Sequence, residues 1–564
     1  MINSNKEYKR VVFCMVPYWP PLLPPQGLAR IKQYIGESGY NCKTFDANIE
    51  VEFKEICDEY FKKINECVPK TKQGNIFDLG YVVLRNQMMG HGKCTKNEQY
   101  INMMRALFKR NFQSDINEED VYGFKEIIDK FYQLLKEYIA NIIEKERPDV
   151  IGLSVYSDNL PASMVAFEYI KSIAPNIITI MGGAIFAGEL IESSPNFNDF
   201  VEETGRYIDK ILIGQGEQLI LSFLKGELDD NQKIYHSRDI PNGVIDISHI
   251  CTPNMTDFKI EQYPYIGTYA SKGCPNKCSF CTVVRNFGEY QERDIDTTIN
   301  EIKFLQEKYK KRAFFMLDSL MNPYITNLSN GIIQEDLSIY IDGYLRISEE
   351  VCDITKTMLW RKGGIYRVRI GVESGSQHVL DLMSKGISVD QTRNALASLS
   401  YAGIKTTTYW VIGHPGETEE DFNQTLKLLE SCKDDIWQAE CHIFEYFYDG
   451  QPSNNEWELS RELLYPKDVS DLLVCKSWTL NTLPSRETSL ERVAIFAEKC
   501  RELGIPNPNT ISEINYADIR WKNLHSNAVP SLIEIQDIKF NEDKSKLGNV
   551  RLAESRIESI DFNF

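Results

Sequence analysis

Short apolar runs alternate with helical patterns along the first part of the chain. Residues 10–17 (RVVFCMVP) are apolar and β-branched, and a proline-rich segment then leads into a helical pattern of Leu28, Ile31 and Ile35. A second strand pattern, TFDANI, follows a Gly-Tyr turn. This succession predicts a βαβ start. The alternation resumes after residue 145 with PDVIGLSVYS, IITIMGGAIF and KILIGQGEQLI. Apolar strands separated by helices predict a parallel, doubly wound sheet.

The remaining patterns divide the chain into further regions. Charged and aromatic helical segments over about 50–145 predict a helical insertion within a Rossmann-like domain at 1–230. Residues 231–265 have mixed polarity and no sustained period, so we expect a connector there. In 266–454, six strand patterns alternate with helical ones, which is typical of an incomplete TIM-type (β/α)6 barrel. Residues 455–564 are predicted to be mostly helical. The expected fold class is therefore α/β.

Composition narrows the class of protein. A chain of 564 residues is too long for one hydrophobic core. No apolar run approaches the roughly 20 residues that cross a bilayer. The first residues show no apolar stretch followed by a small-residue cleavage site, so we expect no signal peptide and a cytoplasmic protein without membrane partners. The formal net charge of -18 argues against a broad nucleic-acid surface, and no nucleic-acid partner is expected.

Three of the fourteen cysteines form one cluster, and the others are scattered in apolar or mixed surroundings typical of buried reduced thiols. Cys274, Cys278 and Cys281 lie directly after the first strand of the predicted barrel, where α/β barrels place their chemistry. Three thiolates in one loop can bind three irons of a cubane and leave the fourth open. An open iron can chelate the amino and carboxylate groups of a bound sulfonium while passing it an electron.

Other readings of the triad stay open at this point. A zinc ion could take these thiols with a fourth ligand from elsewhere, or the thiols could be inert. Structural zinc normally uses two separated pairs of ligands, and His249, His414 and His442 are scattered. The spacing favours the iron–sulfur cluster without excluding zinc.

At these residues the chain resembles a known family. CPNKCSFC resembles the CxxxCxxC signature of radical S-adenosylmethionine (radical SAM) enzymes, in which an aromatic residue often precedes the third cysteine. RIGVESGSQHVLDLMSKG, WVIGHPGETEEDF and FFMLDS are similar to later barrel segments of that family, so the resemblance covers roughly residues 265–450. It implies a [4Fe–4S] cluster and a SAM pocket formed by the residues Phe280, Asp318, Glu373, Ser374, Gly413, Pro415 and Gly416.

Each of these later segments also has a purely structural interpretation. Glu373 could be an exposed polar residue at a strand end. The GHPGET segment could be a turn in which Thr418 caps the following helix. Asp318 could serve packing alone.

The N-terminal region resembles the cobalamin-binding domain that precedes the barrel in one large subclass of this family. The resemblance is carried by VPYWPPLLPPQGLARIKQYIGESGY, DVIGLSVYS, IMGGAIFAGE and LIGQGEQLI. It implies that cobalamin is bound by the residues Pro17, Tyr18, Ser154, Tyr156, Gly182, Gly183, Gly214, Gly216 and Glu217. The chain lacks the Asp-x-His-x-x-Gly motif that supplies a cobalt ligand in many cobalamin proteins, and no GxGxxG follows the first strand. A domain of this fold without cofactor is the alternative.

Together these resemblances imply an anaerobic enzyme that cleaves SAM reductively to a 5′-deoxyadenosyl radical, with electrons from a donor such as flavodoxin or ferredoxin. The subclass consists mostly of methyltransferases, here for an unactivated carbon of a peptide or natural-product small molecule. An epimerase, cyclase or rearrangement enzyme is the alternative, with Cys441 as a hydrogen donor or simply a core thiol. A non-catalytic cofactor-binding scaffold is the alternative of another class. The substrate is expected to contact the insertion and the C-terminal region.

Overall fold

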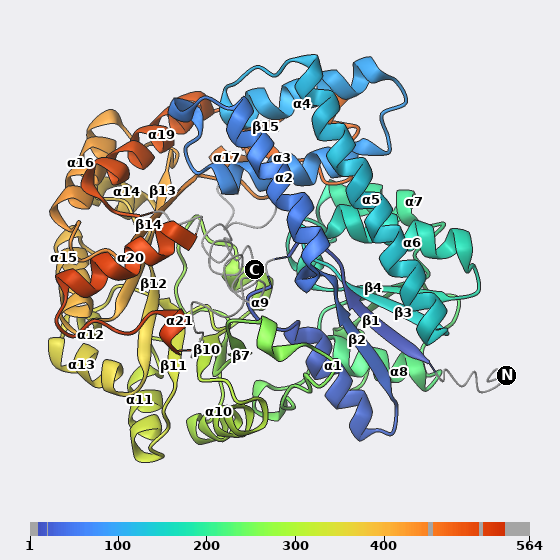
Figure 1. Cartoon of the computed structure of the whole chain (residues 1–564), viewed down its shortest axis with the longest axis horizontal. Helices are drawn as coiled ribbons and strands as arrows, with labels where there is room; N and C mark the ends of the chain where they lie inside the picture. The colour runs from blue at the N-terminus through green and yellow to red at the C-terminus, as the bar shows by residue number, and fades with distance from the viewer. Residues whose placement is uncertain (1–9, 20, 449–454, 507–510, 536–564) are drawn as a thin grey trace.

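The structure, a computed structural model, describes residues 10–19, 21–448, 455–506 and 511–535. Its main strands form two six-stranded sheets, and the strands of both sheets run parallel. In Figure 1 the N-terminal sheet lies on the right of the molecule and the second sheet on the left. Both predicted α/β units are therefore present.

The N-terminal sheet has the strand order β2-β1-β3-β4-β5-β6. Its strands are β1 (Val11–Met15), β2 (Cys42–Asp46), β3 (Val150–Ser154), β4 (Ile178–Gly182), β5 (Lys210–Ile213) and β6 (Ile234–His236). Helices α1 (Gln26–Glu37), α6 (Leu160–Ile173), α7 (Pro195–Thr204) and α8 (Gly216–Leu224) connect them. This is the order of a doubly wound sheet, as predicted. Strand β6 lies in the segment that we expected to be a connector, because three residues are too few to show a period.

Four helices form the predicted insertion between β2 and β3: α2 (Val51–Cys67), α3 (Ile76–His91), α4 (Asn97–Phe112) and α5 (Glu118–Glu146). Asn117 begins α5 by accepting a hydrogen bond from the Asp120 backbone N–H at 2.8 Å, and acidic residues fill the first turn. Figure 1 shows α3 and α4 above the space between the two sheets. Arg110 of α4 pairs with Glu487 at 2.7 Å, so the insertion contacts the C-terminal region.

The second sheet has the order β14-β13-β12-β11-β10-β7. Its strands are β7 (Ile266–Thr268), β10 (Ala313–Met316), β11 (Tyr340–Leu345), β12 (Ile365–Glu373), β13 (Lys405–Ile412) and β14 (Gln438–Ile443). Its main helices are α10 (Ile295–Tyr309), α11 (Ile325–Gln334), α13 (Ile354–Lys362), α15 (Val389–Tyr401) and α16 (Glu419–Ser431). Within the described residues β7 and β14 do not pair, so this is the predicted incomplete barrel.

The C-terminal region is mostly helical, as predicted. It contains α17 (Asn455–Ser460), α18 (Lys467–Ser470), α19 (Arg486–Leu503), α20 (Ile511–Leu524) and α21 (Leu532–Ile535). A short antiparallel pair, β15 (Arg461–Leu463) and β16 (Trp478–Leu480), was not predicted. Buried Trp521 of α20 donates to the Gly403 carbonyl at 3.1 Å, which anchors this region on the barrel.

Buried charges join the two sheets. Arg30 of α1 pairs with Glu301 of α10 at 3.1 Å, and Arg293 pairs with the same carboxylate at 3.2 Å. Thr268 of β7 donates to Glu301 at 2.7 Å. Two guanidinium groups on one buried carboxylate keep it ionised, and the pKa of Glu301 is lowered although burial opposes this. This network holds α1 against the first barrel strand.

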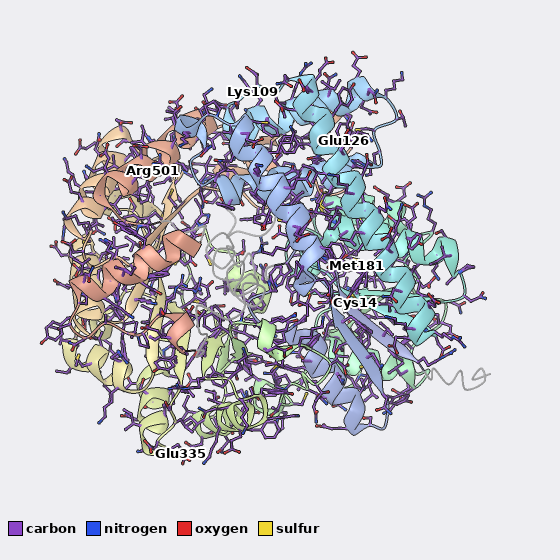
Figure 2. All side chains as sticks on the ribbon, in the orientation of Figure 1. Cys14, Lys109, Glu126, Met181, Glu335 and Arg501 are labelled. Carbon is purple, nitrogen blue, oxygen red and sulfur yellow. The ribbon has the colours of Figure 1, made fainter. Side chains whose placement is uncertain are left out.

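Apolar side chains fill the interior and charged ones cover the outside. In Figure 2, Cys14 of β1 and Met181 of β4 lie inside the N-terminal unit, and both are fully buried. Lys109, Glu126, Glu335 and Arg501 point outward at the periphery. In the described part of the chain, no helix combines the length and apolar character that a bilayer crossing requires.

Candidate active site

The cysteine loop leaves the barrel directly after β7 and the short strand β8 (Ser271–Lys272). Gly273 precedes the first cysteine with a φ of +76°, and a Cβ there would lie 2.9 Å from the Gly288 carbonyl oxygen. Only glycine adopts this turn without strain. The backbone N–H of Ser279 donates to the Met383 carbonyl at 2.9 Å, which ties the loop to the segment after β12.

The three thiols have an environment that fits an iron–sulfur cluster. Arg346 Nη1 donates to Cys278 Sγ at 3.2 Å, and Asn276 Nδ2 lies 3.5 Å from Cys274 Sγ. Burial, together with the neighbouring thiols, raises the pKa of Cys281 to about 11, so this thiol needs a metal to become a thiolate at neutral pH. Within the described residues no three His, Cys, Asp or Glu side chains converge on one ion-sized point. A cubane suits such a spread triad because its irons occupy separate corners.

A cavity of about 290 Å³, here called the cluster cavity, opens beside the triad. Its wall includes Cys274, Cys278, Cys281, Phe280, Asp318, Ser319, Arg346, Arg369, Glu373, Lys385 and Tyr409. Lys385 Nζ donates to the Glu373 carboxylate, and Glu373 has a φ of +64° at the end of β12. A non-glycine residue in this conformation is uncommon, and at a strand end that faces a cavity it is a reason to consider a functional role. The cavity therefore combines thiols, fixed cations and a carboxylate aimed by an unusual backbone.

The structure brings three of the predicted SAM residues to this cavity, namely Phe280, Asp318 and Glu373. The Asp318 carboxylate also accepts the N–H of Ala270 at 3.0 Å and that of Ser271, so it holds the chain just before the cysteine loop. Burial raises the pKa of Asp318 to about 7. Asp318 thus lines the cluster cavity and also has a structural role, the alternative that the sequence left open.

The other four predicted SAM residues lie outside the cluster cavity. Ser374 faces α16, with its hydroxyl 3.1 Å from that of Thr425. Gly413 has a φ of +84°, and a Cβ there would clash with Ser489. Pro415 and Gly416 line a separate hollow that also contacts the cysteine loop. These positions shape the loops around the cavity instead of its wall.

Buried charged residues of the barrel were missed by sequence reasoning. Arg369 pairs with Asp342 at 2.9 Å with both side chains fully buried, and its Nη1 donates to the Tyr409 hydroxyl at 3.3 Å. The signal was present, because arginines at alternate positions of the apolar strand YRVRIGVE share its inner face. Arg346 and Lys385 gave no such signal, because each is a single basic residue in a loop.

A second cavity of about 290 Å³, here called the interdomain cavity, lies between the two sheets. Its wall includes Trp19, Ser154, Tyr156, Glu217, Tyr269, Lys272, Phe287 and Ser319. Trp19 and Tyr156 stack with ring centroids 4.2 Å apart. Flat aromatic faces from both domains suit a planar macrocycle, so the wall fits the predicted cobalamin. No histidine is among its described lining residues, which agrees with the missing cobalt-ligand motif.

Three of the nine predicted cobalamin residues line this cavity, namely Ser154, Tyr156 and Glu217. The others are packed by the chain itself and are Pro17, Tyr18, Gly182, Gly183, Gly214 and Gly216. The Tyr18 hydroxyl donates to the Phe53 carbonyl at 3.2 Å inside the core. A Cβ on Gly183 would lie 2.3 Å from the Val155 carbonyl oxygen. These glycines make room for neighbouring backbone and side chains, which the apolar strand pattern could not distinguish from room for a ligand.

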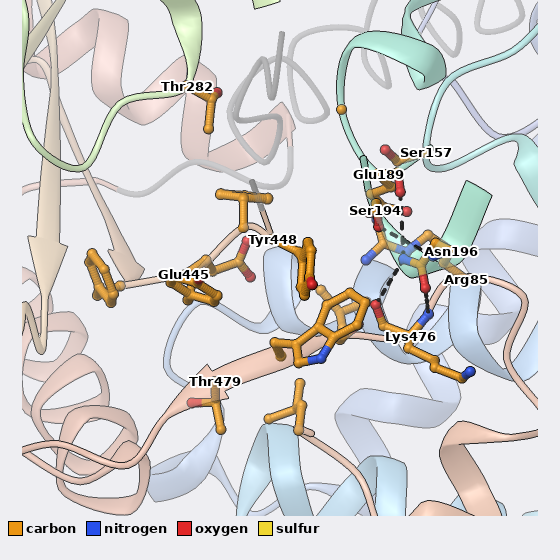
Figure 3. Close-up of a pocket in the computed structure, with 18 of the residues that line it drawn as sticks. Arg85, Ser157, Glu189, Ser194, Asn196, Thr282, Glu445, Tyr448, Lys476 and Thr479 are labelled. Carbon is orange, nitrogen blue, oxygen red and sulfur yellow. Dashed lines mark hydrogen bonds and ion pairs between the residues drawn. The ribbon is translucent and has the colours of Figure 1, made fainter. Parts of the chain in front are cut away.

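A third cavity, of about 150 Å³, is here called the polar chamber (Figure 3). The insertion, the N-terminal sheet, the barrel and the C-terminal region all contribute to its wall, through residues that include Asp78, Arg85, Asp158, Glu189, Asn196, Thr282, His442, Glu445, Tyr448, Lys476, Trp478 and Arg486. The insertion and the C-terminal region, which we expect to contact the substrate, thus meet at this wall.

Cys441 lies outside all three cavities. Its side chain is 1% exposed and its Sγ is 4.0 Å from the Val493 carbonyl, on the side of β14 that faces α19. Burial raises the pKa of this thiol to about 12. This placement favours the core-thiol interpretation that the sequence left open, because side chains alternate along a strand and the neighbouring His442 lines the cluster cavity. Hydrogen donation by Cys441 stays a prediction without support from the geometry.

Comparison with known families gives two matches within the chain. The radical SAM superfamily matches residues 268–429, and the B12 binding domain family matches residues 117–213. The first range contains the cysteine loop and the strands β10 to β13. The second contains α5 and the strands β3 to β5, so it includes part of the predicted insertion. These families imply SAM, a [4Fe–4S] cluster and cobalamin as cofactors.

Individual proteins that resemble the chain share only about a quarter of their residues with it. The chain is 23% identical over 331 residues to the anaerobic magnesium-protoporphyrin IX monomethyl ester cyclase of Rubrivivax gelatinosus, covering 54% of this chain and 58% of that protein. It is 26% identical over 355 residues to an uncharacterized methyltransferase of Pyrococcus horikoshii, covering 60% of this chain and 74% of that protein. The chain thus spans little more than half the length of the cyclase.

Solved structures share the fold. The methyltransferase TsrM of Kitasatospora setae, solved with cobalamin and a [4Fe–4S] cluster, has a TM-score of 0.52 at 13% identity and covers 98% of this chain and 99% of its own. The cobalamin-dependent radical enzyme OxsB, solved with aqua-cobalamin, has a TM-score of 0.51 at 16% identity and covers 76% of this chain and 53% of its own. At this identity the likeness concerns the fold alone.

Proposed function

Since the chain is a member of the radical SAM superfamily that also carries a B12 binding domain, we propose that it is a cobalamin-dependent methyltransferase for a small molecule or peptide. The methyl group would be added to an unactivated carbon. A one-electron donor of the flavodoxin or ferredoxin type would supply electrons to the cluster.

The meeting of the three cavities carries this proposal. The cluster cavity and the interdomain cavity share Ser319. The cluster cavity and the polar chamber share the residues Thr282, His442, Phe444, Glu445 and Phe447. A methyl transfer that begins with a substrate radical needs SAM, cobalamin and substrate within reach of one another. The shared walls support the proposal, because molecules bound in neighbouring cavities would lie within this reach.

The residues of the cluster cavity have roles that follow from their charge. Lys385 can bind the SAM carboxylate, and Glu373 can accept hydrogen bonds from the SAM amino group or ribose. Arg346 partly neutralises the thiolates through its bond to Cys278. When bound, the cluster supplies an electron for SAM cleavage and cobalamin supplies a methyl carrier. The buried Arg369–Asp342 pair would hold Arg369 in place in the wall of the cavity.

A second candidate function is radical ring closure or rearrangement without methyl transfer. The 23% identity to an anaerobic cyclase favours it. Both functions begin with the same cleavage of SAM, so the same residues of the cluster cavity serve either one. The two functions differ in one product, because methyl transfer forms S-adenosylhomocysteine and ring closure does not.

The test uses the full chain, purified without oxygen and reconstituted with iron, sulfide and hydroxocobalamin. We expect four irons per chain by analysis, bound cobalamin by absorbance, and both 5′-deoxyadenosine and S-adenosylhomocysteine after reduction with SAM present. Transfer of a deuterated methyl group to the enzyme-bound corrinoid is followed by mass spectrometry. The variant with Cys274, Cys278 and Cys281 changed to alanine is expected to lose 5′-deoxyadenosine.

Ser154→Phe provides a more selective variant, because Ser154 lines the interdomain cavity and not the cluster cavity. The larger side chain is expected to reduce S-adenosylhomocysteine at least tenfold and to leave 5′-deoxyadenosine in place, whereas Ser154→Ala retains both products. If only 5′-deoxyadenosine forms in the unaltered enzyme, the ring-closure candidate replaces methyl transfer. If neither product forms, the chain is a cofactor-binding scaffold.

A further inference from the structure

The wall of the polar chamber carries more negative than positive charge toward its interior. Its acids are Asp78, Asp158, Glu189 and Glu445, and its cations are Arg85, Lys476 and Arg486. Lys476 Nζ is engaged by Asp199 at 2.6 Å. Arg486 donates to the Arg110 carbonyl at 3.1 Å and to Asn111 Oδ1 at 3.2 Å, on the insertion. Asp78 lies 3.3 Å from the Nδ1 atom of His442. Arg85 is therefore the main cation that faces the other three acids within the described wall.

Arg85 forms ion pairs with two carboxylates. Its Nη1 lies 2.9 Å from Glu189 and 3.8 Å from Asp158. The second carboxylate oxygen of Glu189, Oε2, and the Nε of Arg85 are buried without a hydrogen-bond partner among the described residues. The buried Cys475 thiol, a weak donor, also lies beside the Glu189 carboxylate. A buried carboxylate that lacks a strong second donor is costly, so it is ready to accept an N–H from a ligand.

The environment of Asp158 also favours a cationic ligand. Burial, together with the nearby acids Glu189 and Asp78, raises the pKa of Asp158 to about 6, although Arg85 opposes the shift. Two carboxylates with one guanidinium leave a net negative charge in a place of low effective dielectric. A ligand cation would remove this imbalance, whereas a ligand anion would increase it.

Aromatic rings form the opposite part of the wall. Tyr448 and Trp478 lie with ring centroids 4.8 Å apart. Figure 3 shows Arg85, Glu189 and Lys476 gathered on one side, with Tyr448 between them and Glu445. Aromatic faces bind apolar and planar groups and attract cations as well. The chamber thus has an acidic end and an apolar side.

We propose that the polar chamber binds a substrate with a cationic amine, which pairs with Glu189 on the side of its Oε2 atom and close to Asp158. The apolar body of the substrate lies against Tyr448 and Trp478 and reaches toward the residues shared with the cluster cavity. This inference rests on the proposed function, because the chamber is taken as the substrate site through its wall in common with the cluster cavity.

The experiment compares three small probes that differ in charge: phenethylamine, 2-phenylethanol and 3-phenylpropionate. Their binding to the full-length reconstituted holoenzyme is measured by isothermal titration calorimetry without oxygen. Phenethylamine is expected to bind saturably and at least tenfold more tightly than the other two. Equal binding of all three, or tighter binding of 3-phenylpropionate, would overturn the proposal.

Variants then locate the amine. Glu189→Gln is expected to weaken phenethylamine binding about tenfold or more and to leave 2-phenylethanol unchanged, because only the charged partner is lost. Asp158→Asn is expected to act in the same direction, and it disturbs the fold less because its ion pair with Arg85 is the longer one. Glu202→Gln, which removes a charge from an exposed site on α7, serves as the control. Unaltered phenethylamine binding in both chamber variants, with melting temperatures as in the parent, contradicts the site.

Failure of this proposal can be told apart from failure of the proposed function. Probe binding is measured without reductant or SAM, so it does not depend on turnover. Amine binding without 5′-deoxyadenosine formation would retain the site and overturn the enzyme function. Product formation without preference for the amine would retain the enzyme function and overturn the amine site.

Discussion

The guanidinium of Arg346 lies 3.2 Å from the Sγ of Cys278 and donates a hydrogen bond to it. The two residues are 68 positions apart in the chain. Asn322 holds the Arg346 backbone on both sides, because its side chain accepts the Arg346 N–H and donates to the Arg346 carbonyl, each at 2.8 Å. A fixed positive charge is thus directed at one ligand of the expected cluster.

Replacing Arg346 with Gln is expected to make the cluster harder to reduce. Hydrogen bonds and positive charge at a cluster sulfur stabilise the reduced, more negative state. The reduction potential should fall by about 60 mV, which is a tenfold change for one electron. Electron paramagnetic resonance during a redox titration measures the shift, and iron analysis controls for cluster loss. An unchanged potential with full iron content contradicts the role.

Removing Lys385 is expected to affect both stability and SAM binding. Lys385→Met leaves Glu373 buried without its cation, and breaking a buried ion pair costs about 3–5 kcal/mol. Chemical denaturation measures this loss. In the double variant Lys385→Met with Glu373→Gln, most of the stability should return because no buried charge is left unpaired, whereas the KM for SAM should stay at least tenfold higher. A double variant with normal SAM binding would argue against a cofactor role for the pair.

His414 gives a pH dependence of stability with a defined sign. Burial lowers its pKa from the ordinary 6.5 to about 4, and its Nε2 has no hydrogen-bond partner in the described part of the protein. The unfolded chain therefore binds a proton near pH 6.5 that the folded chain rejects until about pH 4. Stability is lost as the pH falls through this window, by up to about 3 kcal/mol.

The variant His414→Phe tests this assignment. The ring contacts Phe444 and Trp457, with centroids 5.2 and 5.8 Å away, so phenylalanine suits the site. The free energy of unfolding, measured in urea at pH 5 and pH 7.5, should differ less between the two pH values in the variant than in the parent. An identical difference in both proteins would assign the pH dependence to other groups.

Cys441→Ala is expected to leave product formation unchanged. The thiol faces α19 away from the cavities, so its loss only removes a small buried group and lowers stability by about 1 kcal/mol. Product analysis after single and multiple turnovers checks this. Loss of a product in a folded variant would support Cys441 as a hydrogen donor.

Much of the fold could be predicted because its signals are local. Apolar runs such as RVVFCMVP and RAFFMLD became β1 and β10, and the polar helical patterns between them became helices. The cysteine loop could be read directly, since its three thiols lie within one short stretch. The short strand β6 was missed, because three residues carry no periodicity.

The sequence by itself determined the two α/β units, their order and the candidate ligands of the cluster, because strand and helix patterns and the cysteine spacing are properties of neighbouring residues. Only the tertiary structure decided that Arg346 and Lys385 face the cluster cavity, that Cys441 faces away, and that glycines such as Gly183 make room for backbone. The polar chamber also exists only in the tertiary structure, because its wall comes from four separated regions of the chain. The physical reason is that a side chain's direction and its distant partners depend on how packed elements meet, and no local pattern encodes that.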